Sequence, residues 1–301
     1  MSPPALAAAL SDAIAQAIGE PIEVTASAPV GGGSIHSALA ITAETAQGER
    51  RFFAKTNEAD QAPLFAAEAE GLEALRSARC MRVPGVLARG KDDETSWLVL
   101  EWLDLAPLDE RSAASLGTAL AAQHRIAQDR FGWGRDNFIG ATPQVNGWSD
   151  DWLAFWRAKR LHAQLRLAAH NRLPSRMIDR GERLVADCEV FFRNYRPAKS
   201  LLHGDLWSGN AAALADGTPV VFDPAVYVGD READVAMTEL FGGFPRGFAA
   251  AYRAAWALDD GYTVRRELYN IYHVLNHANL FAGGYVAQAE KAIERLLAEI
   301  S

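Results

Sequence analysis

Apolar residues follow two spacings along this chain of 301 residues, and the change between them falls near residue 109. In the first part they alternate with polar residues or form short runs rich in β-branched and aromatic side chains, which predicts strands. These runs occupy residues 22–30, 35–43, 51–57 and 97–103. Helical spacing interrupts them at residues 61–78. Leu6, Leu10, Ile14 and Ile18 lie four residues apart and predict an amphipathic N-terminal helix.

Beyond residue 109 the helical spacing dominates. Helices are predicted within residues 109–128, 149–170, 175–195 and 231–299. Two strand candidates, AAAL and PVVFD, are joined by ADGT, in which Asp-Gly is a hairpin signal, so one hairpin is predicted within this helical part. The pattern predicts an α+β, bilobal chain, with a small β-rich lobe and one key helix over residues 1–103 and a larger helical lobe over residues 104–301. Binding sites favour the interface between two such lobes.

The composition narrows the class of partner. The formal net charge is −8, which argues against nucleic acid because nucleic acid binds basic surfaces. No apolar run approaches the ~18 residues that span a bilayer, and the N-terminal segment lacks the basic flank of a signal peptide. Cys80 and Cys188 show no metal-ligand spacing and are predicted to be reduced thiols. We expect a cytoplasmic protein, monomeric or weakly associating, without membrane or nucleic-acid partners.

The segment LLHGDLWSGN at residues 201–210 holds the most specific chemistry. Asp205 and Asn210 are five residues apart, and Asp223 ends the hairpin that follows. This spacing matches the catalytic loop of protein kinases and their metal-binding aspartate. Phosphoryl transfer needs a carboxylate that receives the acceptor proton and hard oxygen ligands for Mg²⁺. We therefore predict Asp205 as the catalytic base and Asn210 and Asp223 as metal ligands. Each alone could hold a turn, but the combination favours catalysis.

Upstream residues supply a candidate nucleotide site. A glycine-rich segment between two predicted strands consists of Gly31, Gly32, Gly33 and Ser34. Its backbone could approach phosphates closely, although most such segments are only turns. Lys55 lies in an apolar strand, and Glu68 lies in line with Leu64 and Leu72 on one helix face. A carboxylate facing a core needs a partner, so we predict that Lys55 pairs with Glu68 and orients ATP. An exposed Glu68 is the alternative.

The run WLVLEWL would connect the two lobes. By analogy with kinases, the carbonyl of Glu101 and the amide of Leu103 are predicted to bind adenine. His203 is predicted to brace the catalytic loop rather than to react.

With these residues together, the chain resembles the fructosamine kinase (ketosamine-3-kinase) family of the aminoglycoside-phosphotransferase-like, protein-kinase-like superfamily. The resemblance follows the family's order over most of the chain. The sequence motifs that carry the resemblance are GGGSI, FFAKTN, GLEAL, FGWGRDNFIGATPQ, LLHGDLWSGN and YVGDREADVAMTELFGGF. Trp207-Ser208-Gly209 and the GDREAD segment are more specific to this branch than a general kinase pattern.

The resemblance implies ATP- and Mg²⁺-dependent phosphorylation of the 3-hydroxyl of a ketosamine, such as a fructosamine, ribulosamine or erythrulosamine. The unstable 3-phosphate releases the amine, so the activity repairs glycation, with a free or protein-bound ketosamine as the substrate. It also implies that Asp234 braces the catalytic loop through backbone N–H groups. Locally Asp234 is a first-turn acid favoured by the helix dipole, with Asp230 as the N-cap.

Substrate residues are less determined. Trp207 could stack on a sugar or pack within the lobe, and Asp136 and Asn137 could bind substrate or hold a turn. At Ser34-Ile35-His36 the resembled family commonly has Cys-Ile-Ser, and this departure argues against redox control through that loop.

Two rival functions differ in class. One is a related kinase of another small alcohol, of the aminoglycoside, choline or homoserine type, against which the GDREAD segment argues. The other is a non-catalytic nucleotide-binding protein. Such a protein would have lost the base or a metal ligand, but all of them are present here.

Overall fold

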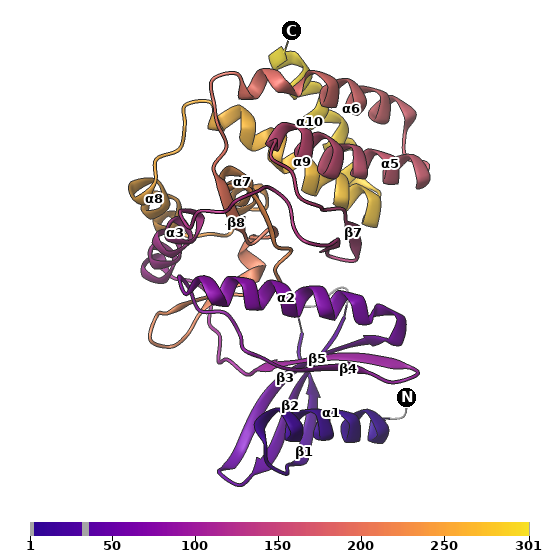
Figure 1. The fold of residues 1–301 in the computed structure, drawn as a ribbon, viewed down its shortest axis with the longest axis vertical. Coiled ribbons are helices and arrows are strands. Elements are labelled where there is room, and N and C mark those ends of the chain that lie inside the picture. The colour runs from indigo at the N-terminus through magenta and orange to yellow at the C-terminus, as the bar shows by residue number, and fades with distance from the viewer. Residues whose placement is uncertain (1–2, 32–35, 301) are drawn as a thin grey trace.

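The structure is a computed structural model, and it describes residues 3–31 and 36–300. The N-terminal lobe is a five-stranded antiparallel sheet in the order β1-β2-β3-β5-β4, with one long helix on each face (Figure 1). Its elements are α1 (Pro3–Ile18), β1 (Glu23–Pro29), β2 (Ser37–Thr45), β3 (Gly48–Glu58), α2 (Ala62–Ala78), β4 (Val86–Lys91) and β5 (Thr95–Glu101).

The interior strand β5 is apolar without alternation because both of its faces are covered. Trp97 and Val99 pack with α1, whereas Leu98 and Leu100 pack with α2. Successive strand side chains point to opposite faces, so a strand covered on both faces buries every residue. α2 lies between the sheet and the C-terminal lobe (Figure 1), and its inner face can therefore contribute to a site between the lobes.

The C-terminal lobe is mainly helical. Its helices are α3 (Glu110–His124), α4 (Trp152–Phe155), a π-helical turn (Trp156–Leu161), α5 (His162–His170), α6 (Ser175–Asp187), α7 (Arg231–Leu240), α8 (Arg246–Ala255), α9 (Tyr262–Phe281) and α10 (Gly284–Ile300). Its strands are β6 (Asn137–Ile139), β7 (Thr142–Gln144), β8 (Lys199–Leu202), β9 (Ala211–Ala213), β10 (Pro219–Val221) and β11 (Tyr227–Asp230). The strands form three two-stranded sheets, β6-β7, β8-β11 and β9-β10.

Most elements expected from the sequence are present, and the α+β bilobal class is confirmed. In the N-terminal helix, Leu10 and Ile14 are fully buried, as the four-residue spacing predicts. The prediction of a single embedded hairpin in the second lobe was wrong, because β8 also pairs with β11 and β6 with β7. These strands have three or four residues, too few to show a period. The lobe boundary at residues 103 and 104 stays a prediction; β5 ends at Glu101 and α3 begins at Glu110.

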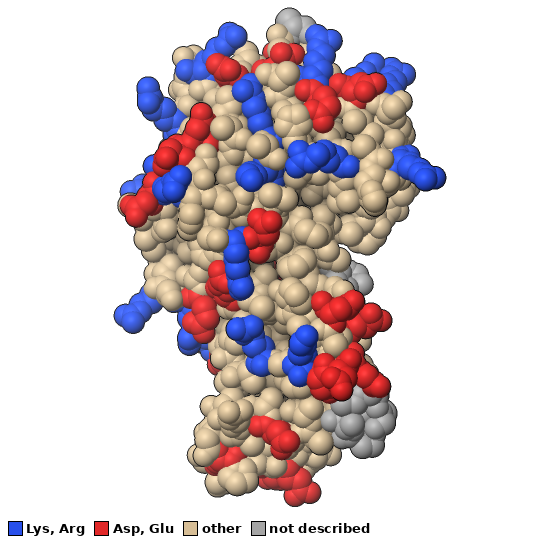
Figure 2. All heavy atoms as spheres, turned by 45° about the vertical axis from the view of Figure 1, so that its right-hand side comes forward, with Lys and Arg blue, Asp and Glu red and all other residues tan. Residues whose placement is uncertain are grey.

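The surface shown in Figure 2 carries blue basic and red acidic side chains interspersed over both lobes. A protein that binds nucleic acid concentrates basic side chains on one face, and this face does not do so. Within residues 3–31 and 36–300, no helix is both long and apolar enough to cross a bilayer.

Candidate active site

The loop after β8 carries Asp205, and its backbone is held from behind by α7. Asp234 of α7 accepts hydrogen bonds from the backbone N–H groups of His203 (2.7 Å) and Gly204 (2.8 Å), one on each carboxylate oxygen. Gly204 has a φ of +82°, and a Cβ there would lie 2.0 Å from the carbonyl oxygen of Ala225. Only glycine allows this turn, which directs the chain toward Asp205.

Further contacts connect Asp234 to the interior of the lobe. The Nε2 atom of His124 lies 3.2 Å from Asp234 Oδ2, and His124 Nδ1 lies 2.9 Å from the hydroxyl of Tyr252. Arg231 donates to the same hydroxyl at 3.2 Å. The consistent proton arrangement has Tyr252 donating to His124 Nδ1 and His124 Nε2–H donating to Asp234. Burial alone would raise the pKa of Asp234, but the bonds from His124 and the loop outweigh it, and this pKa is lowered.

His203 joins the catalytic loop to the strand that leads to Asp223. Its Nε2 lies 3.0 Å from the carbonyl oxygen of Phe222, and its Nδ1 accepts the backbone N–H of Asp205 at 3.3 Å. Burial lowers the pKa of His203, which agrees with a neutral ring that donates from Nε2 and accepts at Nδ1. These contacts hold the ring inside the structure, where it faces protein backbone.

Asp205, Asn210 and Asp223 lie together in front of this support. The Asn210 amide nitrogen donates to the Asp205 carbonyl (2.9 Å), to Asp205 Oδ2 (3.3 Å) and to the Asp223 carbonyl (3.4 Å). Burial, and then the Asp223 carboxylate, raise the pKa of Asp205 to about 7, although the bond from Asn210 opposes them. A carboxyl group with such a pKa exchanges its proton readily at neutral pH.

The lysine from the sheet reaches the same place. Lys55 Nζ lies 2.7 Å from Glu68 Oε1 on α2 and 2.6 Å from Asp223 Oδ1. Burial alone would lower the pKa of Lys55, but the two carboxylates outweigh it and raise this pKa. The structure thus brings β3, α2 and the loop after β10 to one point, with the Glu68 side chain turned inward toward Lys55.

The backbone at Asp223 is unusual. Its φ is +57°, in the left-handed region that residues other than glycine seldom adopt. Such conformations cost free energy and often occur at functional sites. Here the conformation lets the carboxylate reach Lys55 while the Asp223 carbonyl accepts from Asn210.

The donor set fits Mg²⁺. Because the Asn210 nitrogen makes the bonds to Asp205 and Asp223, its amide oxygen points the other way. The Asp223 side chain is 43% exposed, and its Oδ1 is the oxygen bound to Lys55. Among the described residues no group of three or more His, Cys, Asp or Glu side chains could hold a metal by itself. Magnesium at phosphoryl-transfer sites takes one or two protein ligands together with phosphate oxygens, and the side-chain oxygens of Asn210 and Asp223 are donors of the kind that it prefers.

The other predicted nucleotide residues lie along the sheet. Gly31 follows β1, whereas Gly32, Gly33 and Ser34 lie outside the described residues. The Glu101 carboxylate contacts Arg82 and accepts the backbone N–H of Gly85 at 3.1 Å, and the Glu101 N–H donates to the Gly85 carbonyl at 2.8 Å. Leu103 follows β5 and is half-buried.

Of the substrate candidates, Trp207 lies on the surface, two residues after Asp205. Its side chain is 39% exposed and meets Phe241 edge to face, with ring centroids 6.4 Å apart. A Cβ on Gly209 would lie 2.2 Å from the Trp207 ring, so glycine is needed for the ring to occupy this place. One end of the indole is thus fixed by protein and the rest remains open.

Asp136 and Asn137 make internal contacts. Asp136 accepts the backbone N–H of Asn146 at 2.7 Å. The buried Asn137 donates to the Val226 carbonyl at 2.7 Å, and its oxygen accepts from Gln144 and Asn146. These bonds favour the turn-holding alternative for both residues.

Sequence reasoning missed His124 and Tyr252. Their bonds join residues 110 and 128 positions apart, so no local pattern could reveal them. His36 was noted only as a departure from the resembled family, although its ring lies beside this site.

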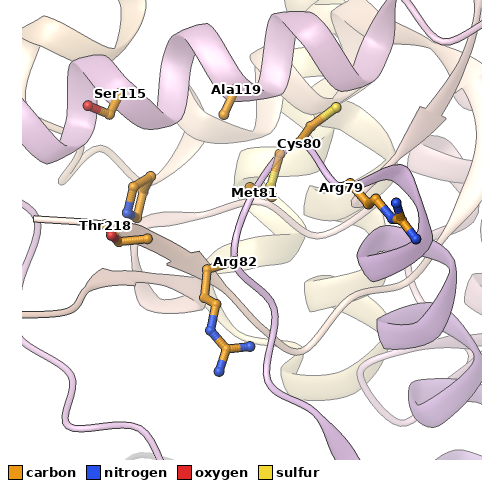
Figure 3. Close-up of a pocket in the computed structure, with 8 residues that line it drawn as sticks. Arg79, Cys80, Met81, Arg82, Ser115, Ala119 and Thr218 are labelled. Atoms are coloured by element: carbon orange, nitrogen blue, oxygen red, sulfur yellow. The ribbon is translucent and has the colours of Figure 1, made fainter.

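A separate cavity of about 450 Å³ lies between the end of α2, α3 and the start of β10. Figure 3 shows Ser115 and Ala119 facing it from one helix, while the Arg82 guanidinium points away from that helix. Its remaining lining residues are Arg79, Cys80, Met81, Thr218 and Pro219. None of these is a predicted site residue, so the cavity is distinct from the group around Asp205.

Comparisons with known proteins agree with this geometry. A "Probable ketoamine kinase" of Synechocystis is 41% identical over 293 residues, covering 96% of each chain. The "Protein-ribulosamine 3-kinase, chloroplastic" of Arabidopsis thaliana is 39% identical and covers 97% of this chain and 90% of its own length.

Solved structures share the fold. A candidate fructosamine-3-kinase from Haemophilus somnus superposes with a TM-score of 0.85 at 28% identity, covering 96% of both chains. The ADP-bound aminoglycoside phosphotransferase APH(2'')-Ib has a TM-score of 0.59 at 13% identity over 94% of this chain and 98% of its own, which shows the protein-kinase-like fold alone.

The family profile described as fructosamine kinase matches residues 6–299, almost the whole chain. Together with relatives about 40% identical over nearly their full lengths, this match shows that the chain belongs to the fructosamine kinase family.

Proposed function

We propose that this chain is an ATP-dependent kinase that phosphorylates the 3-hydroxyl of ketosamines and thereby takes part in deglycation. The observation that carries the proposal is the convergence of Asp205, Asn210, Asp223 and Lys55 from three separate segments: the loop after β8, the loop after β10, and β3. Such a group provides a proton acceptor, two oxygen ligands and a cation within one small volume. The named activities of the family relatives supply the ketosamine.

In this proposal Asp205 receives the proton of the acceptor hydroxyl as that oxygen attacks the terminal phosphate of ATP. Its pKa of about 7 suits this exchange near neutral pH. Asp234, through the backbone of residues 203 and 204, and His203, through the Asp205 N–H, keep the carboxylate in place. Positioning of this kind is the main contribution a protein makes to phosphoryl transfer.

Asn210 and Asp223 would hold Mg²⁺, which neutralises charge on the phosphates when bound. Lys55, oriented by Glu68, would bind phosphate oxygens. In the present arrangement Asp223 also pairs with Lys55 at 2.6 Å, so the two oppositely charged groups are already gathered where phosphate and metal ion would enter. Their mutual bond keeps both side chains partly ordered before the nucleotide binds.

The adenine end of the bound ATP would lie along the segment at the end of β5. We assign the Glu101 carbonyl and the Leu103 amide as its contacts, and Gly31, Gly32, Gly33 and Ser34 as phosphate contacts. Support comes from the Glu101 side chain, which is tied to Arg82 and to the Gly85 backbone. A fixed side chain at this point steadies the backbone groups beside it.

On the acceptor side Trp207 is the best-placed residue. It follows the base by two positions, and its exposed face offers a flat apolar surface to a sugar ring. Asp136 and Asn137 are retained only as supports of a neighbouring turn, because their polar atoms bond to protein groups. Cytoplasmic location and a monomeric state stay predictions.

The test is a substrate panel with ATP and Mg²⁺. Fructosyl-, ribulosyl- and erythrulosyl-lysine would be compared with choline, homoserine and an aminoglycoside. We expect turnover on ketosamines, higher for the pentose and tetrose compounds by family analogy, with phosphate on the 3-oxygen by phosphorus NMR. An equal lack of turnover on every ketosamine, with turnover on one of the other alcohols, would favour the rival kinase.

A further inference from the structure

His36 lies at the nucleotide end of the site but has no role in the proposed function. It stands between the glycine-containing segment and the first residue of β2. Its ring packs against Phe65 of α2, with ring centroids 4.9 Å apart. The ring is therefore fixed to the same helix that carries Glu68.

The strand register places His36 on the same face as Lys55. Ala38 of β2 lies directly opposite Lys55 of β3, and Ser37 lies opposite Thr56. Side chains two positions apart share a face of a sheet, so Asn57 shares the face of Lys55. His36, one residue before β2, lies on that face as well, because its ring bonds to Asn57. The ring of His36 thus stands diagonally across the strand pair from the lysine that binds Asp223.

A hydrogen bond sets the tautomer of this ring. The backbone N–H of Glu58 donates to Asn57 Oδ1 at 2.8 Å, which turns the Asn57 amide nitrogen toward His36 Nδ1, also 2.8 Å away. An amide nitrogen only donates, so His36 Nδ1 accepts. Burial, and then the charge of Lys55, lower the pKa of His36 to about 4. A neutral ring whose Nδ1 accepts carries its proton on Nε2, on the far side from Asn57.

The Nε2–H group is a donor that the described part of the protein leaves available. The contacts of the ring within residues 3–31 and 36–300 are the bond at Nδ1 and the packing on Phe65. Lys55 and Asp223, which act on the ring through their charges, mark where phosphate and metal ion are expected. A neutral N–H donor beside a cation suits an anionic oxygen, because charge-assisted hydrogen bonds are stronger than neutral ones.

We propose that His36 binds the nucleotide by donating a hydrogen bond from Nε2 to an oxygen of the β- or γ-phosphate. This inference rests on the proposed function only in taking ATP as the nucleotide. Asn57 is then a positioning residue, because it acts by fixing the tautomer and the direction of the ring.

The test compares nucleotides that differ only in phosphate number. Titration calorimetry with Mg²⁺ would measure ATP, ADP and AMP binding to the wild type and to His36→Phe, which keeps an aromatic ring on Phe65 but has no donor. We expect ATP affinity to fall about tenfold, the size expected for one hydrogen bond to a charged group, and AMP affinity to stay unchanged. An equal loss for ADP assigns the bond to the β-phosphate, and a loss for ATP alone assigns it to the γ-phosphate.

Two further variants keep the test decisive. His36→Ala removes the donor without adding volume, should His36→Phe fold poorly, and it should show the same contrast between ATP and AMP. His36→Gln places an amide N–H near the position of Nε2 and should recover part of the ATP affinity. His170→Ala, on the exposed end of α5, is the matched control and should bind all three nucleotides as the wild type does.

Unchanged ATP affinity in both donor-free variants would overturn the proposal. Equal weakening of AMP would also overturn it, because it would show a structural role for the ring. These measurements need no ketosamine, so a failure of the ketosamine panel and a failure of this proposal are separate results.

Discussion

The catalytic loop has a carboxylate on each side, partly buried at the front (Asp205) and fully buried at the rear (Asp234), and the two differ in their proton affinity. At the front, the pKa of Asp205 is raised to about 7 by burial and by the nearby Asp223. At the rear, the pKa of Asp234 is lowered in spite of burial, because His124 and two backbone N–H groups donate to it. The rear carboxylate is satisfied by donors, whereas the front one accepts a single side-chain bond from Asn210 at 3.3 Å.

This difference in pKa suits the two carboxylates to different tasks, one to hold the loop and the other to accept a proton. A carboxylate saturated with donors is a stable charge that can anchor two backbone groups. A carboxylate with few donors and a like charge beside it keeps affinity for a proton, which a general base requires. Under the proposed function, the two tasks belong to residues whose chain positions are 29 apart but which lie on either side of one loop.

The largest expected effect is at the front. Asp205→Asn keeps the size of the side chain but removes the proton acceptor, so turnover should fall by about 10³-fold, within the usual range for general base catalysis. ATP binding should change little. Steady-state assays and calorimetry on the same preparation would measure both. Asp216→Asn, in the exposed hairpin turn where Asp216 accepts the N–H of Thr218, is the matched control and should be fully active. Wild-type turnover in Asp205→Asn would refute the assignment of the base.

The next effect concerns the metal ligand at the front. Asp223→Ala removes one of the two proposed protein ligands of Mg²⁺ and one partner of Lys55. We expect the gain in ATP affinity that Mg²⁺ provides to fall about tenfold or more. Calorimetry with and without Mg²⁺ would show this, with Asp216→Ala as the control. An undiminished magnesium effect would mean that the ion is held elsewhere.

A smaller effect is expected at the rear. His124→Phe removes the donor to Asp234 and leaves the two backbone donors in place. The free energy of unfolding should drop by about 1–3 kcal/mol, the usual cost of an unsatisfied buried group. Turnover should fall about tenfold, because the loop is less well positioned. ATP affinity should remain, since the nucleotide residues are untouched.

His124→Gln supplies a donor at a similar position and should restore part of the turnover. Chemical denaturation and steady-state kinetics would be run on both variants. If Phe and Gln lowered turnover equally, then packing rather than the hydrogen bond would be the function of His124.

The sequence was sufficient where its signals were local. The apolar run at residues 97–103 predicted a short strand, and the spacing of Asp205, Asn210 and Asp223 indicated one site. The four-residue spacing of Leu64, Glu68 and Leu72 predicted that Glu68 faces the core, where it meets Lys55. In each case the information lies within about twenty residues of chain.

The remaining features of the fold and the site depend on contacts between residues that are far apart in the sequence. The short strands β8 and β11 exist because Leu202 pairs with Tyr227, and neither strand is long enough to show a period of its own. The bonds of His124 to Asp234 and to Tyr252 join three helices. His124 shows how little a lone histidine reveals in sequence, since its function follows only from the buried carboxylate that meets it.

The smallest expected effect concerns a third carboxylate, that of the buried Asp230, which is the N-cap of α7. Asp230 accepts bonds from Tyr195, Tyr269 and the backbone of Glu232, as many donors as Asp234 has. Its pKa is nevertheless raised to about 7, by burial and then by the Glu232 carboxylate. Asp205 and Asp230 thus each have another carboxylate nearby, Asp223 and Glu232 respectively. Asp230 and Asp234 have equal numbers of donors but opposite pKa shifts, which indicates that a neighbouring negative charge decides the direction of the shift.

A raised pKa of Asp230 has a definite consequence for stability. Between the ordinary pKa of 3.8 and about 7 the folded protein holds a proton at Asp230 that the unfolded chain has released. This contribution to the free energy of unfolding is complete below the lower value and declines as the pH rises through that window. Asp230→Asn removes it but keeps an N-cap side chain. Denaturation at pH 5, 6, 7 and 8 should show the wild type losing stability relative to the variant up to pH 7 and no further loss above. A constant difference would mean that Asp230 ionises normally, and the donors rather than the charge of Glu232 would then control its pKa.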